Sequence, residues 1–82
     1  MSTRNKIAEV FNSVASEQQR TLAPLTDKLK LVDSGLDSLS MALVVAHLDD
    51  AFNVNPFDTL QTFPVTFADF VGLYEEALRA HG

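Results

Sequence analysis

The 82-residue sequence contains no cysteine, which excludes disulfides and thiolate zinc sites. Any thiol chemistry would therefore come from a group attached to the chain. The first six residues lead straight into mixed apolar and polar positions, so we expect no signal peptide, and no apolar run is long enough to span a membrane. We expect a soluble, cytoplasmic protein without stable membrane association.

Basic residues are absent from residues 31–78, which carry eight Asp or Glu residues. Residues 1–30 hold five Lys or Arg residues beside three acids, and the formal net charge is −5. An acidic segment of this kind repels nucleic acid and anionic lipid, and it speeds encounters with basic protein surfaces. The simpler alternative is that the acids only keep a small domain soluble.

The length predicts one domain over residues 1–82, near the smallest size at which a single core holds without disulfides or metals. Internal repeats and low-complexity segments are absent. Apolar residues at helical spacing predict a first helix from about residue 3 to residue 19 or 20, with Ser2 or Thr3 as its cap. Its apolar side is expected to face the core.

Residues 26–37 form a long connection for so small a domain, because Pro24 ends the first helical pattern. The connection and the residue before it carry regularly placed apolar residues: Leu25, Leu29, Leu31, Val32 and Leu36. We expect these residues to hold the connection against the other helices.

The C-terminal third predicts a short helical turn near residues 57–61 and a last helix over residues 67–80. Thr66, followed by Asp69 three residues later, is typical of a capping box. The aromatic residues of the last helix indicate core rather than nucleic-acid stacking, since no basic residue lies among them. The predicted fold is all-α: a small four-helix bundle of three long helices and one short helix.

The predicted second helix, residues 38–52, is apolar on nearly all sides, which is unusual in a soluble protein. At 100° per residue, one side carries Met41, Val44, Val45, Leu48 and Phe52, and the other carries Leu39, Ala42, Leu43, Ala46 and Asp50. We expect the first side to be core and the second, with Asp49 at its end, to dock partner proteins. The alternative is that both sides are buried.

Ser38 follows a glycine-containing loop at the predicted start of this helix. Unpaired N–H groups and the helix dipole stabilise a negative group, such as a phosphate ester, at a helix start. The simpler interpretation is that Asp37 or Ser38 only caps the helix.

The segment Gly35-Leu36-Asp37-Ser38-Leu39 resembles the 4'-phosphopantetheine attachment motif of the acyl carrier protein family, and the order of predicted elements is similar over most of the chain. The resemblance implies that Ser38 carries this arm, taken from coenzyme A, whose thiol holds acyl groups as thioesters. It also implies that Asp37 contacts the phosphopantetheinyl transferase as well as capping the helix, and that partner enzymes bury Leu39. The protein would then be a monomeric carrier and not an enzyme, and no residue is expected to be catalytic or to bind a metal.

The sequence departs from the pattern of carriers in ordinary fatty acid synthesis, which usually have acids along the exposed side of this helix. Ser40 and Leu43 stand at the corresponding positions. Besides the transferase, the expected partners are acyl-transferring or acyl-activating enzymes of fatty acid, polyketide, nonribosomal or lipid-tailoring biosynthesis. The departure favours a specialised pathway.

Three other functions were weighed against a carrier. A hydrolytic enzyme is disfavoured, because His47, nine positions from Ser38, is too far along the helix to take its proton. A calcium site is disfavoured, because the segment lacks the central glycine and closing glutamate of the twelve-residue EF-hand calcium loop. Its candidate ligands would be Asp49, Asp50, Asn53, Asn55 and Asp58. A non-catalytic, acidic, helical protein-interaction adaptor stays open, and it predicts no modification of Ser38.

Overall fold

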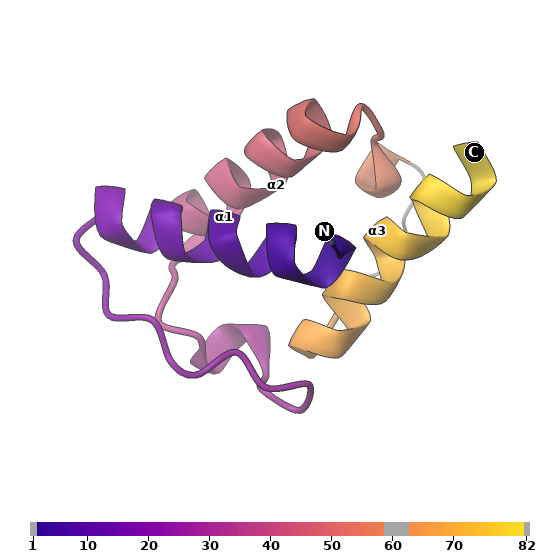
Figure 1. Ribbon diagram of the computed structural model, residues 1–82. Helices are drawn as coiled ribbons and strands as arrows, with labels where there is room; N and C mark the ends of the chain where they lie inside the picture. The colour runs from indigo at the N-terminus through magenta and orange to yellow at the C-terminus, as the bar shows by residue number, and fades with distance from the viewer. Residues whose placement is uncertain (1, 59–62, 82) are drawn as a thin grey trace.

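The computed structural model describes residues 2–58 and 63–81. Its α-helices are α1 (Thr3–Glu17), α2 (Ser38–Phe52) and α3 (Phe67–His81), and two short 3₁₀ turns lie between them, η1 (Leu31–Asp33) and η2 (Pro56–Asp58). α1 packs against both α2 and α3. Figure 1 shows α1 crossing the middle of the molecule, with the connection from α1 to α2 looping away from the helices.

The predicted four-helix bundle is wrong, because the described part of the chain holds three α-helices and no strand. At the place of the short helix expected over residues 57–61 the structure has the single 3₁₀ turn η2, and residues 59–62 lie outside the described residues. Proline keeps the residue before it extended, so Pro64 stops any helix from running on into the segment before α3. Turns of 3₁₀-helix rarely exceed about four residues.

The helix starts follow the capping residues of the sequence. Ser2 caps α1 by accepting a 3.1 Å hydrogen bond from the Asn5 N–H. At α3, the Asp69 N–H donates to the Thr66 hydroxyl at 3.1 Å, and the Thr66 N–H donates to the Asp69 carboxylate at 3.2 Å. The predicted capping box is therefore confirmed, and both partners satisfy backbone donors that the first turn leaves free.

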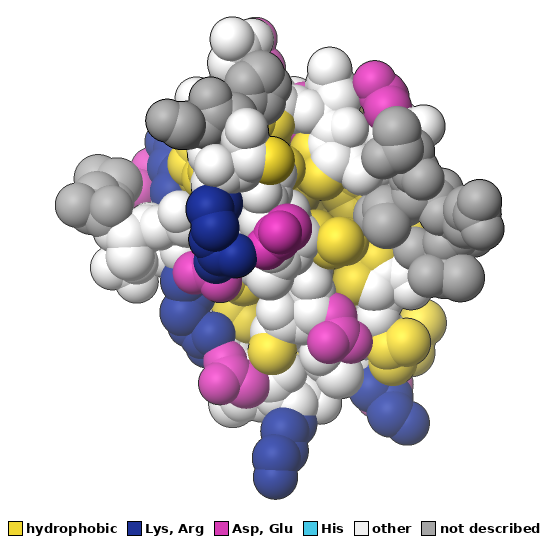
Figure 2. All heavy atoms as spheres, turned by 90° about the vertical axis from the view of Figure 1, so that its right-hand side faces the viewer, with side chains coloured by type: hydrophobic (Ala, Val, Ile, Leu, Met, Phe, Trp, Pro, Cys, Tyr) yellow, Lys and Arg dark blue, Asp and Glu magenta, His cyan; other side chains and the backbone are white. Residues whose placement is uncertain are grey.

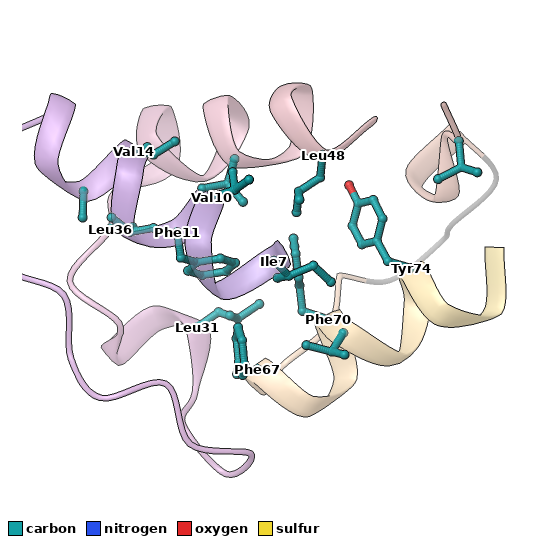
Figure 3. Packing of buried hydrophobic residues seen from close by; sticks show 14 residues of the cluster. Ile7, Val10, Phe11, Val14, Leu31, Leu36, Leu48, Phe67, Phe70 and Tyr74 are labelled. Carbon is teal, nitrogen blue, oxygen red and sulfur yellow. The ribbon is translucent and has the colours of Figure 1, made fainter. Parts of the chain in front are cut away.

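The core lies between the three helices, and its centre is aromatic. Phe11 of α1 meets Phe67 and Phe70 of α3 edge to face, with ring centroids 5.3 Å apart in both pairs. This geometry is favoured by the ring quadrupoles. Figure 3 shows Phe67, Phe70 and Tyr74 extending from α3 into the space between the helices. The prediction that the aromatic residues of the last helix form core is confirmed for all three, since each is fully buried.

The connection between α1 and α2 is fastened to the start of α3. Lys30 and Thr66 form an isolated antiparallel bridge. Beside it, the Leu31 N–H donates to the Val65 carbonyl at 2.9 Å. These contacts give backbone groups of the long connection partners without forming a sheet.

Two of the apolar residues in this connection, Leu31 and Leu36, are buried as predicted. Val32 was expected to pack in the same way, and that prediction is wrong because its exposed fraction is 86%. Val32 lies in η1, where successive side chains point in different directions, so burial of Leu31 turns Val32 outward. None of the described helices is long and apolar enough to cross a membrane.

Candidate functional site

The loop before α2 is shaped by a close approach of two backbone segments at Gly35. Gly35 has φ +98°, and a Cβ placed there would lie 2.1 Å from the Thr21 carbonyl oxygen. Only glycine fits this position without displacing the backbone. Next to it, the Ala23 N–H donates to the Ser34 carbonyl at 2.8 Å. The segment after α1 is thus held against the residues that lead into Ser38.

Asp37 is the N-cap of α2 and ends the loop. Its carboxylate accepts a 2.8 Å hydrogen bond from the Ser40 N–H and an ion-pair hydrogen bond from the Arg20 guanidinium. The bond from the Ser40 N–H, with the charge of Arg20, holds the pKa of Asp37 below its ordinary value. The ionised cap therefore stabilises the fold at neutral pH, and this stabilisation is lost as the pH falls through the lowered pKa.

Three serines lie within seven residues around the start of α2, and the structure distinguishes them. Ser34 is buried, and its hydroxyl donates to the Leu31 carbonyl at 2.7 Å. Ser40 is also buried, and its hydroxyl has no hydrogen-bond partner among the described residues. Ser38, the first residue of α2, is exposed. Of the three hydroxyls, only that of Ser38 is available to another molecule.

Ser40 therefore corrects one interpretation of the sequence. In the resemblance to acyl carrier proteins, Ser40 stands at a position expected on the exposed side of this helix, but it is fully buried. With Val44 and Leu48, Ser40 forms the buried side of α2, since positions three to four residues apart share one helix face.

The first turn of α2 has backbone donors to spare. The Ser40 N–H is taken by the Asp37 side chain, and the Met41 N–H donates to the Asp37 carbonyl at 2.9 Å. The N–H groups of Ser38 and Leu39 make no hydrogen bond to the described residues. These two donors and the positive end of the helix dipole lie beside the Ser38 hydroxyl.

An apolar groove of about 860 Å³ opens beside Ser38. Its lining residues come from the loop, α2, η2 and the segment before α3: Leu31, Val32, Leu36, Asp37, Ser38, Met41, Ala42, Val45, Phe57, Phe63, Pro64 and Val65. Among them only Asp37 and Ser38 have polar side chains. The rings of Phe57 and Phe63 stack with centroids 5.3 Å apart. A molecule attached to Ser38 would therefore have apolar walls within reach.

The predicted docking side of α2 is largely at the surface. Leu39, Ala42, Ala46 and Asp50 are exposed, and the exposed fraction of Leu39 is 61%. Leu43 is half-buried and packs on the core. The alternative that both sides of α2 are buried is wrong. On the side of the molecule that faces right in Figure 1, hydrophobic side chains also reach the surface between charged ones (Figure 2).

Asp49 differs from the other predicted docking residues. It is half-buried, and its carboxylate accepts a 2.7 Å hydrogen bond from the Tyr74 hydroxyl. This bond gives Asp49 a partner inside the fold. Within the described ranges, no three His, Cys, Asp or Glu side chains form a cluster that could hold a metal ion.

Sequence reasoning missed two parts of the site. Arg20 was assigned only to the end of the first helix, but α1 ends at Glu17, and Gln19 at φ 56° turns the chain so that Arg20 reaches Asp37. The groove was missed because Phe63 and Val65 lie far from Ser38 in sequence. The one sequence feature that pointed to the groove was the apolar run Phe63-Pro64-Val65 directly before Thr66.

Comparisons with models of known protein families, with curated proteins and with solved structures give no match for this chain. The function is therefore inferred from the geometry around Ser38 together with the resemblance of its sequence motif.

Proposed function

We propose that the chain is an acyl carrier protein in which Ser38 bears a 4'-phosphopantetheine arm. The observation that carries this proposal is the position of Ser38: an exposed hydroxyl at the first residue of α2, beside an apolar groove, between two serines that are buried. The motif around it resembles that of carrier proteins, and no catalytic role is assigned to the chain itself.

The residues present fit the phosphodiester by which such an arm is attached. The free N–H groups of Ser38 and Leu39 offer hydrogen bonds to phosphate oxygens, and the helix dipole favours their negative charge. When attached, the arm supplies a thiol that carries acyl groups as thioesters. The cysteine-free chain offers no competing thiol.

The groove supports an apolar cargo. Met41, Val45 and Phe57 line it together with exposed Val32 and Val65, so a hydrocarbon chain lying there would lose contact with water. The core next to Phe11 and Phe70 leaves no shelter deeper inside, because those two rings pack against each other. The cargo is therefore held at the surface, beside Ser38.

The exposed side of α2 supports docking of partner enzymes. Leu39 directly follows Ser38, and Ala42 and Ala46 continue the same surface along the helix. Small apolar residues allow a partner to approach closely, which suits a transient contact that must bring Ser38 into an active site. A phosphopantetheinyl transferase and acyl-transferring or acyl-activating enzymes are the proposed partners.

The experiment is incubation of the full chain with coenzyme A and a broad-specificity phosphopantetheinyl transferase, followed by intact-mass measurement. We expect one phosphopantetheine group per chain, with none on Ser38→Ala. Ser13→Ala is the matched control, because Ser13 is an exposed serine on α1, and it should be modified like the wild type. An unchanged wild-type mass would contradict the proposal and favour the adaptor.

A further inference from the structure

Arg20 links the segment after α1 to the start of α2. Its guanidinium forms an ion pair with the Asp37 carboxylate, 17 residues away in sequence. The backbone of Arg20 is itself held, because its N–H donates to the Ala15 carbonyl at 2.8 Å. The cation therefore reaches Asp37, the residue directly before Ser38, from a part of the chain that is fixed by α1.

Two further contacts keep this segment in place. The Thr21 carbonyl lies against Gly35, where no side chain would fit, and the Ala23 N–H donates to Ser34. Together with the ion pair, these contacts join residues 20–23 to residues 34–37 at three successive places. The segment after α1 is thus fastened along its length, and Arg20 stays beside Asp37.

Both oxygens of Asp37 accept hydrogen bonds, but the ion pair uses only part of the donor capacity of Arg20. One Asp37 oxygen accepts from the Ser40 N–H and the other from Arg20. A guanidinium has five N–H donors in a planar fork, and beyond the bond to Asp37 the Arg20 guanidinium makes no hydrogen bond to the described residues. Arg20 can therefore bind a second anion next to Asp37 without leaving it.

The charges around Ser38 favour a cation beside the serine once it is modified. Residues 31–78 contain no Lys or Arg, so the sequence neighbours of Ser38 supply acids only. A phosphodiester on Ser38 adds a negative charge directly beside the Asp37 carboxylate, and like charges at such short range repel each other. Arg20 comes from outside the acidic segment and already contacts Asp37.

We propose that Arg20 is the counter-ion of the modified serine, with its guanidinium bridging the Asp37 carboxylate and the phosphodiester on Ser38. This inference rests on the proposed function, since that function supplies the phosphodiester. Arginine suits the role because its fork binds carboxylate and phosphate oxygens simultaneously. Arg20 acts here as a positioning residue: it holds the attachment point of the arm in one place and lets Asp37 stay ionised as the helix cap.

The test compares the midpoint of thermal unfolding (Tm) of unmodified and modified full-length chains. Modified chains are made in two ways, with the transferase and coenzyme A, and by incorporating phosphoserine at position 38 during synthesis. Arg20→Gln should lower the Tm of either modified form by several degrees more than that of the unmodified form. Arg20→Lys should show a smaller excess loss of Tm in the modified chains. In 1 M salt the excess loss of Arg20→Gln should shrink, because exposed charges are then screened within about 3 Å.

Arg4→Gln is the matched control, because Arg4 forms an ion pair of the same type with Asp27, a residue of the loop remote in sequence from Ser38. This variant should lower the Tm of modified and unmodified chains equally. An equal loss for Arg20→Gln would overturn the inference. If the transferase leaves the chain unmodified while the phosphoserine form shows the excess loss, the carrier function fails and Arg20 stands as an anion-binding residue.

Discussion

The hydroxyl of Tyr74 donates a 2.7 Å hydrogen bond to the Asp49 carboxylate, and this bond joins α3 to the last turn of α2. In Figure 3 the hydroxyl points from α3 towards α2. Burial raises the pKa of Tyr74 far above its ordinary value, and the bond to Asp49 adds to the shift. The tyrosine in the folded chain is therefore still neutral at a pH where a free tyrosine has lost its proton.

Tyr74→Phe removes this bond and should lower the free energy of unfolding by about 1–2 kcal/mol at pH 7. Below about pH 10, the ordinary tyrosine pKa, the folded and unfolded states both hold the proton and the stabilisation is complete. Above it only the unfolded state releases the proton, so wild-type stability falls as the pH rises. Denaturant titrations between pH 7 and about pH 11 should show that the free energy of unfolding falls less with rising pH in Tyr74→Phe than in the wild type. Equal slopes would contradict the assignment.

Ser40→Ala should raise stability by up to about 1 kcal/mol, because alanine is the better helix former and the buried Ser40 hydroxyl, although close to the Asp37 carboxylate, makes no hydrogen bond of good geometry. Ser34→Ala is the matched control, since Ser34 is equally buried but bonded to Leu31. It should lower stability by a similar amount. Thermal unfolding of both variants tests the contrast, and a loss of stability in Ser40→Ala would show that its hydroxyl is satisfied.

Gly35→Ala should destabilise the chain by about 2 kcal/mol or more, because the new methyl group meets the Thr21 carbonyl and φ is positive. Gly72→Ala is its control. A Cβ at Gly72 meets nothing within 4 Å, and α3 should gain about 1 kcal/mol from the better helix former. Thermal unfolding should show a lower Tm for Gly35→Ala and a higher Tm for Gly72→Ala than for the wild type. If Gly35→Ala were tolerated, the backbone contact between Thr21 and Gly35 would not hold the loop.

Leu39→Glu should slow modification of Ser38 by the transferase at least tenfold while leaving Tm nearly unchanged. Leu39 is mostly exposed, so its replacement costs the fold little, but a charge there disrupts an apolar contact with a partner. Ser13→Glu introduces the same charge at an exposed position of α1 and should be modified at the wild-type rate. Initial rates measured by intact mass decide the question, and equal rates for both variants would remove Leu39 from the docking surface.

Much of the fold was predictable, because local signals and burial agree along the helices. Asp37 and Thr66 fix the starts of α2 and α3. Of the five residues predicted for the core side of α2, Val44 and Leu48 are buried, whereas Met41, Val45 and Phe52 are only half-buried. The fourth helix was wrong, since so few residues carry no periodic signal that distinguishes a helix from a single 3₁₀ turn such as η2.

The candidate site was only partly predictable. Ser38 and Asp37 follow from local chemistry, because both lie at a helix start. The ion pair to Arg20 and the groove depend on contacts between distant segments, which no periodicity in the sequence reports. Burial of Ser40 went against its polar character, and neighbouring Val44 and Leu48 determine it.

The central claim is that Ser38 carries the prosthetic arm, and the most direct measurement is fragmentation mass spectrometry of the protein purified from the cells that make it. The peptide containing residues 34–40 holds the three serines that the structure distinguishes. Phosphopantetheine on Ser38, with Ser34 and Ser40 unmodified, is the predicted result. Peptides that carry no phosphopantetheine, or carry it on another residue, would contradict the account.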